Sequence, residues 1–296
     1  MADQPVARWK RWQWAVVLVV LLAFLGGAWW LWQRVYSQLS ADEQFRLSDT
    51  TLLVTPQPPW IDAATNVKAD VLRDATLHQI TLWDDQAVLR VARAFELHPW
   101  VRRVVRASKQ PPGVIHVELE YRRPIALVEV LFNDVLSYEP VDADGVILPE
   151  DLFHRRPELV DDYLKITVDY ALPTVPVGAV WNDERVTGAA RLAALLENHW
   201  KAWALSRIAV SADLAVDRHP VFELRTRGLS RIRWGHAPGQ EPKGEPPADR
   251  KLAWIAGYVR EHGPLDRPNQ PAVVLDVRSD TGLQIVPAGE PQPNPE

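Results

Sequence analysis

The chain contains no cysteine and a single methionine in 296 residues. Without cysteine there can be no disulfide, thiolate metal site, iron–sulfur cluster or thiol nucleophile. The fold must therefore be held by hydrophobic cores, and at ~150 residues per domain the part beyond the N-terminus is expected to form two domains.

Excess positive charge is also lacking outside the N-terminus. Residues 1–34 carry four basic residues and one acidic residue, so the remainder has a net charge of −8 within a total of −5. A nucleic-acid-binding surface needs a clustered basic stripe, and binding to anionic lipid needs a similar excess of lysine and arginine. The sequence therefore argues against nucleic acid and against an anionic lipid surface as partners of the main body.

Enzyme motifs are missing as well. The eight histidines are scattered, and neither a His-Glu-x-x-His, a Gly-x-Ser-x-Gly nor a phosphate-binding glycine loop occurs. Asp142-Ala143-Asp144-Gly145 imitates the start of a calcium loop, but Phe153 occupies the position of its closing acidic residue, so a β-turn is expected instead. Asp161-Asp162 could be an acid–base pair, although adjacent carboxylates in a loop are usually solvated. We predict no catalytic, cofactor-binding or metal-binding residue and no small-molecule substrate.

One long apolar run stands near the N-terminus. Residues 14–32 carry no charge, and at about 1.5 Å per residue they reach about 28 Å, close to the ~30 Å hydrocarbon core. Tryptophans cluster at both ends of the run, as they do at membrane interfaces. We predict a transmembrane helix over 13–33, between a tail at 1–12 and a linker at 34–46. A cleaved signal peptide is the rival interpretation, disfavoured because no small-residue cleavage site follows the run.

The orientation follows from the flanking charges. Arg8, Lys10 and Arg11 precede the run, whereas Arg34 alone follows it closely. The positive-inside rule then places the N-terminus in the cytoplasm and the rest of the chain outside. The predicted location is the cytoplasmic (inner) membrane, with periplasmic or extracytoplasmic domains.

The segment from 86 to 126 has the clearest local pattern. Val88, Val91 and Phe95 recur at helical spacing, and His98-Pro99 ends that helix. A short apolar segment follows from 101, then a Pro-Pro-Gly turn at 111–113, and then strict alternation over 114–121. Such alternation is typical of a half-buried strand, so a helix followed by a hairpin is predicted. With a strand at 52–54 and a helix at 67–75, residues 47–123 form a βααββ unit.

Residues 124–287 are expected to form a second, strand-rich domain with two amphipathic helices. Strands are predicted at 125–131, 135–141, 146–148, 205–210, 221–226, 229–234, 273–277 and 283–286. The helices fall at 183–200, capped by Asn182 or Asp183, and at 250–261. The Pro- and Gly-rich segment 236–247 is predicted to be a mobile loop, and 288–296 a disordered tail. The fold class is thus α+β behind one transmembrane helix.

A basic cluster lies in the first domain. Its residues are Arg102, Arg103, Arg106 and Lys109, together with Arg122 and Arg123. The cluster is either a solvated face or a docking surface for an acidic partner.

Several segments, in this order, resemble the FtsQ/DivIB family of bacterial cell-division proteins. They are His-Pro-Trp-Val at 98–101, Glu-Tyr-Arg-Arg-Pro-Ile-Ala at 120–126, Val-Asp-Ala-Asp-Gly-Val at 141–146, and the series 228–235, Lys251-Leu252 and 275–278. The resemblance covers residues 47–286, roughly four-fifths of the chain. It implies a POTRA domain at 47–123, a β-domain at 124–287, and a divisome scaffold that is not an enzyme.

The resemblance also implies how a partner is bound. In this family the last β-domain strand is an exposed edge that pairs with a strand from FtsB, which forms a coiled coil with FtsL. Carried over by position, the partner-binding residues are Asp276, Arg278, Ser279, Thr281, Gly282, Leu283 and Ile285. Arg278 would meet a partner carboxylate, and Gly282 would permit close approach. The chain departs from the family at Ser279, where an aromatic is common, and in lacking a tryptophan after the last strand.

Two other functions stay open. A POTRA-bearing transport or assembly factor would also be a binding protein, but it usually carries several POTRA units or a long β-barrel. A membrane-tethered cell-wall hydrolase would need a paired-carboxylate or metal site, which the sequence does not indicate. The sequence does not predict the oligomeric state.

Overall fold

A computed structural model describes residues 6–41, 47–82, 84–111, 113–210, 219–266 and 271–286, and for 6–16 and 35–41 it describes the backbone only. The chain divides into two compact units. The first comprises 1–55, 68–94 and 105–118, and the second comprises 56–67, 95–104 and 119–296. The predicted tail 288–296 lies outside the described residues. The domain boundary predicted at 123 stays a prediction.

The N-terminal helix α1 spans Val6–Ala41. Within it, residues 17–34 have a mean hydropathy of 1.5 and none of them is buried by the rest of the protein. The helix is therefore long and apolar enough to cross a membrane, as the sequence predicted. It continues into the segment that the sequence assigned to a linker, because nothing between 34 and 41 breaks a helix.

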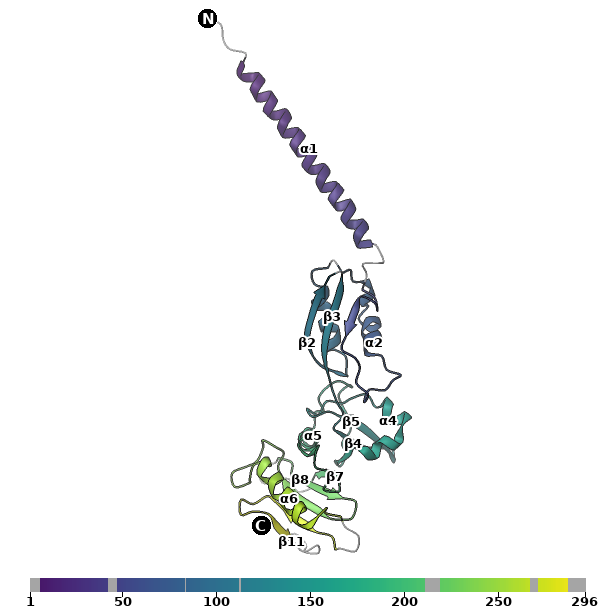
Figure 1. The fold of residues 1–296 in the computed structure, drawn as a ribbon, viewed down its shortest axis with the longest axis vertical. Helices are drawn as coiled ribbons and strands as arrows, with labels where there is room; N and C mark the ends of the chain where they lie inside the picture. The colour runs from purple at the N-terminus through teal and green to yellow at the C-terminus, as the bar shows by residue number, and fades with distance from the viewer. Residues whose placement is uncertain are drawn as a thin grey trace. The chain divides into compact units, whose positions relative to one another are not determined.

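The elements between residues 52 and 121 follow the βααββ order expected from the sequence. They are β1 (Leu52–Val54), α2 (Val67–Asp74), the 3₁₀ turn η2 (Leu77–Gln79), α3 (Ala87–Glu96), β2 (Val101–Gln110) and β3 (Val114–Tyr121). The three strands form a sheet in the order β1-β3-β2, with β1 parallel to β3 (Figure 1). Val91 and Phe95 of α3 are buried, and so are Ile115 and Val117 of β3. The helical and the alternating spacing thus each put one apolar face into a core.

The second unit contains an eight-stranded mixed sheet. Its order is β11-β10-β9-β8-β7-β6-β4-β5. The strands are β4 (Ala126–Phe132), β5 (Val135–Val141), β6 (Leu164–Thr167), β7 (Leu205–Val210), β8 (Phe222–Thr226), β9 (Arg231–Gly235), β10 (Val274–Asp276) and β11 (Gln284–Val286). Parallel pairs are β4 with β6, β6 with β7, and β9 with β10, and the other neighbours are antiparallel.

Helices cover both faces of this sheet. The larger core contains residues of α5 (Glu184–Leu196) and α6 (Ala248–His262) together with Val128 and Val130 of β4. On the other face, Leu127 packs with Leu152 and Phe153, which belong to α4 (Asp151–Arg155). The turn η3 (Pro157–Asp162) continues this smaller layer. Because β4 is buried on both faces, its sequence is a nearly continuous run of apolar residues.

One local prediction is wrong. Residues 146–148 do not form a strand, since Val146 and Ile147 make only isolated bridges, to Val180 and Val141. The segment 236–247 has neither helix nor strand, as predicted, but His236, Ala237 and Pro246 within it are buried. A buried ion pair described below packs this loop against α6, and its mobility stays a prediction.

Candidate functional site

The predicted partner-binding edge centres on β11. This strand is the outermost strand at one end of the sheet and pairs with β10 through Val274↔Val286, Leu275↔Ile285 and Asp276↔Gln284. Among the described residues, no strand pairs with its outer side. Ile285 is 61% exposed, so an apolar side chain lies on the surface of this edge.

The other residues predicted for this site do not lie on one strand. Asp276 belongs to β10, an inner strand between β9 and β11. Arg278, Ser279, Thr281 and Gly282 lie in the connection that follows, where the Gly282 N–H donates to the Ser279 carbonyl at 3.3 Å. Leu283 packs against the main core. The continuous edge from 276 to 285 expected from the sequence is therefore an inner strand, a turn and a short outer strand.

Arg278 is engaged within the chain. Its guanidinium donates to both carboxylate oxygens of Asp276, with Nη2 to Oδ2 at 2.6 Å and Nε to Oδ1 at 3.0 Å. Burial raises the pKa of Asp276, but the hydrogen bonds from Arg278 and the charges of Arg278 and Arg233 together outweigh burial and hold this pKa below its ordinary value. An approaching carboxylate would have to share Arg278 with Asp276.

Gly282 has the backbone freedom that its predicted role needs. Its φ of +112° lies in the region that favours glycine, and a Cβ built there meets no atom within 4 Å. Space is thus open beside it, while the close approach of a partner stays a prediction.

The β2 part of the basic cluster does not present four unpaired cations. Arg103 Nε lies 2.6 Å from Glu120, and Arg102 lies 3.0 Å from Asp144. Lys109 donates to the carbonyl of Leu82. Side chains alternate between the two faces of a strand, so Arg102 and Arg106 point to one face of β2 and Arg103 and Lys109 to the other. Docking of an acidic partner there stays a prediction.

Two of the family-like segments are joined by a buried ion pair. Arg122 Nη1 lies 2.6 Å from Asp142 Oδ2, with only 16% and 5% of the two side chains exposed. Asp142 also accepts hydrogen bonds from the N–H groups of Asp144 and Val146, each at 2.9 Å. Gly145 (φ +76°) completes this turn, where a Cβ would lie 2.8 Å from the Thr187 methyl group. The β-turn predicted at 142–145 is confirmed, and its first residue, Asp142, forms an ion pair with Arg122.

A second buried network anchors the 236–247 segment. The Lys251 side chain has no exposed surface, forms an ion pair with Glu245, and donates to the Trp234 carbonyl at 2.9 Å. Glu245 also binds His236, through Nδ1 at 2.7 Å and the backbone N–H at 2.9 Å. Burial lowers the pKa of Lys251, while Glu245 partly offsets the effect. Gly235 (φ +97°) is needed here, because a Cβ would collide with the Glu245 carboxylate. No local sequence pattern indicates this network, although the Gly235 and Lys251 positions belong to the family-like series.

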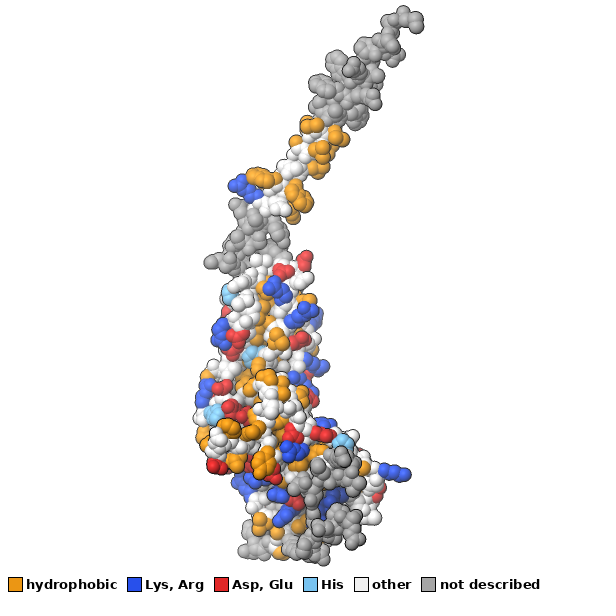
Figure 2. All heavy atoms as spheres, turned by 180° about the vertical axis from the view of Figure 1, so that it is seen from behind, with side chains coloured by type: hydrophobic (Ala, Val, Ile, Leu, Met, Phe, Trp, Pro, Cys, Tyr) orange, Lys and Arg blue, Asp and Glu red, His pale blue; other side chains and the backbone are white. Residues whose placement is uncertain are grey.

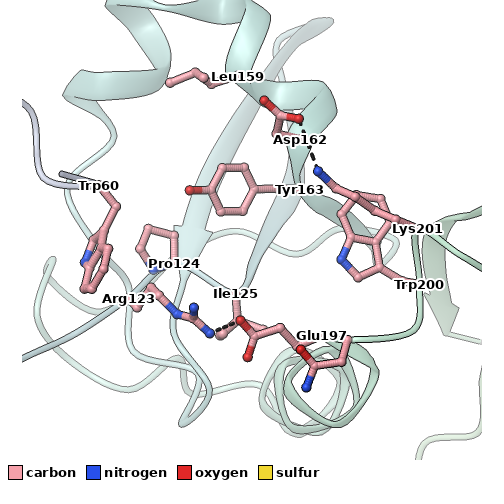
Figure 3. A pocket seen from close by; sticks show the side chains of 11 residues that line it. Trp60, Arg123, Pro124, Ile125, Leu159, Asp162, Tyr163, Glu197, Trp200 and Lys201 are labelled. Carbon is pink, nitrogen blue, oxygen red and sulfur yellow. Dashed lines mark hydrogen bonds and ion pairs between the residues drawn. The ribbon is translucent and has the colours of Figure 1, made fainter. Parts of the chain in front are cut away.

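An aromatic pocket of about 530 Å³ lies near the N-terminal ends of β4 and β6 (Figure 3). Figure 3 shows the Tyr163 ring across its middle, with Trp60 on one side and Trp200 on the other, and Pro124 and Ile125 below. The Trp60 indole N–H donates to the Arg122 carbonyl at 2.9 Å. No local sequence pattern indicates this pocket, because its residues come from four segments that are distant in the chain.

Two ion pairs form the rim of the aromatic pocket. Arg123 binds Glu197, and Lys201 Nζ lies 3.3 Å from Asp162. Burial raises the pKa of Tyr163, so its hydroxyl keeps its proton at neutral pH. The pocket therefore offers ring surfaces for stacking and no activated nucleophile.

The residues weighed as catalytic or metal-binding candidates do not assemble into a site. Asp161 pairs with Lys165 at 2.9 Å, whereas Asp162 pairs with Lys201. Within the described parts of the chain, no three His, Asp or Glu side chains are grouped so that they could hold a metal ion.

Comparison with known proteins adds no family assignment. No protein-family model matches the chain, and no curated protein matches it significantly.

Proposed function

We propose that this chain is a membrane-anchored, non-enzymatic scaffold of the bacterial division machinery, of the FtsQ/DivIB kind. In this proposal α1 holds the chain in the cytoplasmic membrane, with the N-terminus in the cytoplasm and the two units outside. The βααββ segment acts as a POTRA domain and the eight-stranded sheet as the β-domain. The ordered resemblance over residues 47–286 and the long apolar helix support this proposal.

The observation that carries the proposal is the position of β11 at the end of the sheet. An outermost strand presents N–H and C=O groups that a partner strand can pair with, so main-chain hydrogen bonds supply affinity. The proposed partner is an FtsB/FtsL-like coiled coil that contributes an extended segment. Since only Gln284–Val286 are paired as β11, main-chain groups are few, and exposed Ile285 must supply much of the contact.

A test combines localisation with recovery of the partner. A tagged full-length chain in its own organism is expected at mid-cell during division, and a coiled-coil division protein is expected to co-purify from detergent-solubilised membranes. Ile285→Asp should reduce that recovery by about tenfold, because it places a charge on the contacting face of β11. Its exposed position should leave the fold intact.

The matched control is Tyr170→Asp, a change at a residue of the same unit that is 98% exposed and far from β11 in sequence. It should leave recovery unchanged. Uniform distribution of the tagged chain around dividing cells would overturn the proposal, whereas mid-cell localisation with unchanged recovery from Ile285→Asp would overturn only the binding edge.

A further inference from the structure

The opposite end of the eight-stranded sheet is closed by the β4–β5 hairpin. Asn133 and Asp134 form its two-residue turn with φ values of 49° and 61°, as a type I′ turn requires. The register pairs Phe132 with Val135 and Leu131 with Leu136. In the described chain β5 has a strand neighbour on one side only, and apart from the isolated bridge of Val141 to Ile147 at its end, its other side is a second open edge of the same sheet.

The register determines which main-chain groups face outward. The pair next to a two-residue turn exchanges both hydrogen bonds, and bonded and non-bonded pairs then alternate along the ladder. Leu136 and Tyr138 accordingly direct their N–H and C=O groups away from β4, and Pro140 directs its C=O group the same way. The Pro140 carbonyl confirms this alternation, because it accepts a hydrogen bond from Leu148 N at 2.8 Å on the outer side. Leu136 and Tyr138 remain as the outward-facing positions of β5.

The tip of this hairpin is unusually apolar for a surface. Leu131, Phe132, Val135 and Leu136 are 64%, 59%, 66% and 51% exposed. Figure 2 shows hydrophobic side chains gathered over the part of this unit where β4, β5 and α4 lie. Single exposed apolar residues are normal, but four around one turn mark an interaction surface.

A groove of about 610 Å³ continues the apolar surface behind β5. Leu136, Tyr138, Phe153 and Val160 line it, and Glu150, His154 and Asp161 add charged or polar groups. A strand added to β5 would therefore place alternate side chains into a preformed groove that is partly apolar and partly acidic.

Acidic residues beside the open edge of β5 indicate the charge of the segment that would bind there. Burial and the nearby charge of Glu150 both raise the pKa of Glu139, and they outweigh the opposing effect of His154. Among the described residues Glu139 forms no ion pair, since His154 contacts Glu150 instead, at 3.1 Å. A lysine or arginine from a partner would relieve this accumulation of negative charge.

We propose that β5 is a docking edge for an extended segment of another protein, one that alternates apolar residues with a lysine or arginine. The basic side chain lies against Glu139, and the apolar side chains cover Leu136 and Tyr138. A second copy fits less well: antiparallel pairing about Ser137 would bring its Asp134 toward Glu139 and Glu150. The chain's own residues 287–296 fit less well too, because they contain two glutamates and no basic residue.

The test uses the full chain in detergent micelles and a short fluorescent peptide that alternates valine and lysine. Binding is measured by fluorescence anisotropy, and a photo-crosslinking residue at Val135 locates the bound peptide. Glu139→Gln should weaken binding about tenfold, and Glu139→Lys should reverse the preference toward a valine–glutamate peptide. Leu136→Lys should weaken the binding of both peptides. The control is Leu229→Lys, at an apolar residue in another turn that is 73% exposed, and it should leave the binding of both peptides unchanged.

Backbone methylation of the peptide tests strand addition without altering the protein. N-methyl groups on one set of alternate residues block one edge of the peptide, so one methylated peptide should bind and its out-of-phase counterpart should not. Equal binding of the two would overturn the strand-addition mode. An unchanged preference in Glu139→Lys would overturn the predicted basic partner, and self-association of the chain that Leu136→Lys abolishes would replace it with a second copy.

Discussion

At the scale of single residues, the most unusual group is a lysine without exposed surface. Lys251 gives up its hydration and receives in exchange the Glu245 carboxylate, the Trp234 carbonyl and the face of the Trp234 ring, whose centroid is 5.0 Å away. Burying two opposite charges does not by itself stabilise a protein, but removing one of them leaves the other uncompensated. The pair therefore fixes the position of the 236–247 segment on α6.

Neutralising one member of this pair tests that role. We expect Glu245→Gln to lower the free energy of unfolding by roughly 3–5 kcal/mol, because Lys251 must then stay charged without a partner or lose its proton. Lys251→Met should cost less, since the Glu245 carboxylate keeps its hydrogen bonds from His236 when the lysine is removed. The measurement is the urea midpoint of the full chain, with hydrogen exchange of α6 locating the change.

A double-mutant cycle separates the pair from its surroundings. The combined Lys251→Met and Glu245→Gln variant should lose less stability than the sum of the two single changes, by more than about 1 kcal/mol. Lys243→Met, at an exposed lysine of the same segment, is the matched control and should change little. Additive effects of the two buried substitutions would contradict a coupled pair.

At the scale of elements, α5 has a well-defined start. The sequence left Asn182 and Asp183 as alternative caps, and the structure selects Asp183, whose Oδ1 accepts a hydrogen bond from Arg185 N at 2.9 Å. Glu184 adds an acidic residue in the first turn, where the helix dipole favours negative charge. The helix then packs against β4, β6 and β7, so its N-terminus is tied to the centre of the sheet.

Removing this cap should destabilise the second unit measurably. We expect Asp183→Ala to cost about 1 kcal/mol, because one N–H of the first turn loses its acceptor. Asp183→Asn keeps an acceptor oxygen and should retain most of the stability. Thermal unfolding of the two variants beside the unchanged chain measures the difference, and equal losses would indicate that the charge contact with Arg185 matters more than the cap.

The element scale also shows why the two ends of the large sheet differ. β11 has only three residues and one exposed apolar side chain, Ile285, whereas β5 has seven residues and an apolar hairpin tip. Short edge strands resist unwanted pairing, while a longer apolar edge is a stronger template. The two proposed docking edges would therefore rely on different balances of main-chain and side-chain contacts.

At the scale of the whole molecule, the orientation in the membrane can be tested directly because the chain has no cysteine. A single cysteine at Tyr170, which is 98% exposed, should react with a membrane-impermeant maleimide in intact spheroplasts. A single cysteine at Gln4 should react only after the membrane is permeabilised, because Arg8, Lys10 and Arg11 favour a cytoplasmic N-terminus. Labelling in the opposite pattern would invert the proposed topology.

Sequence alone determined much of the local structure. The uncharged run at 14–32, the helical spacing before His98 and the alternation over 114–121 each encode their element through side-chain periodicity, and periodicity is a local property. The strand predicted at 146–148 does not form, because its residues make isolated bridges to two separate segments and do not pair continuously with one neighbouring strand.

Only the tertiary structure decided the sheet order, the pairing of Arg278 with Asp276, and the burial of Lys251 against Glu245. It also assembled the Trp60–Tyr163–Trp200 pocket and exposed the edge of β5. These features join residues that are distant in sequence or depend on what packs on each side, and no local pattern records which strand ends up outermost. Spacing therefore specified the elements, while long-range packing determined the surfaces they present.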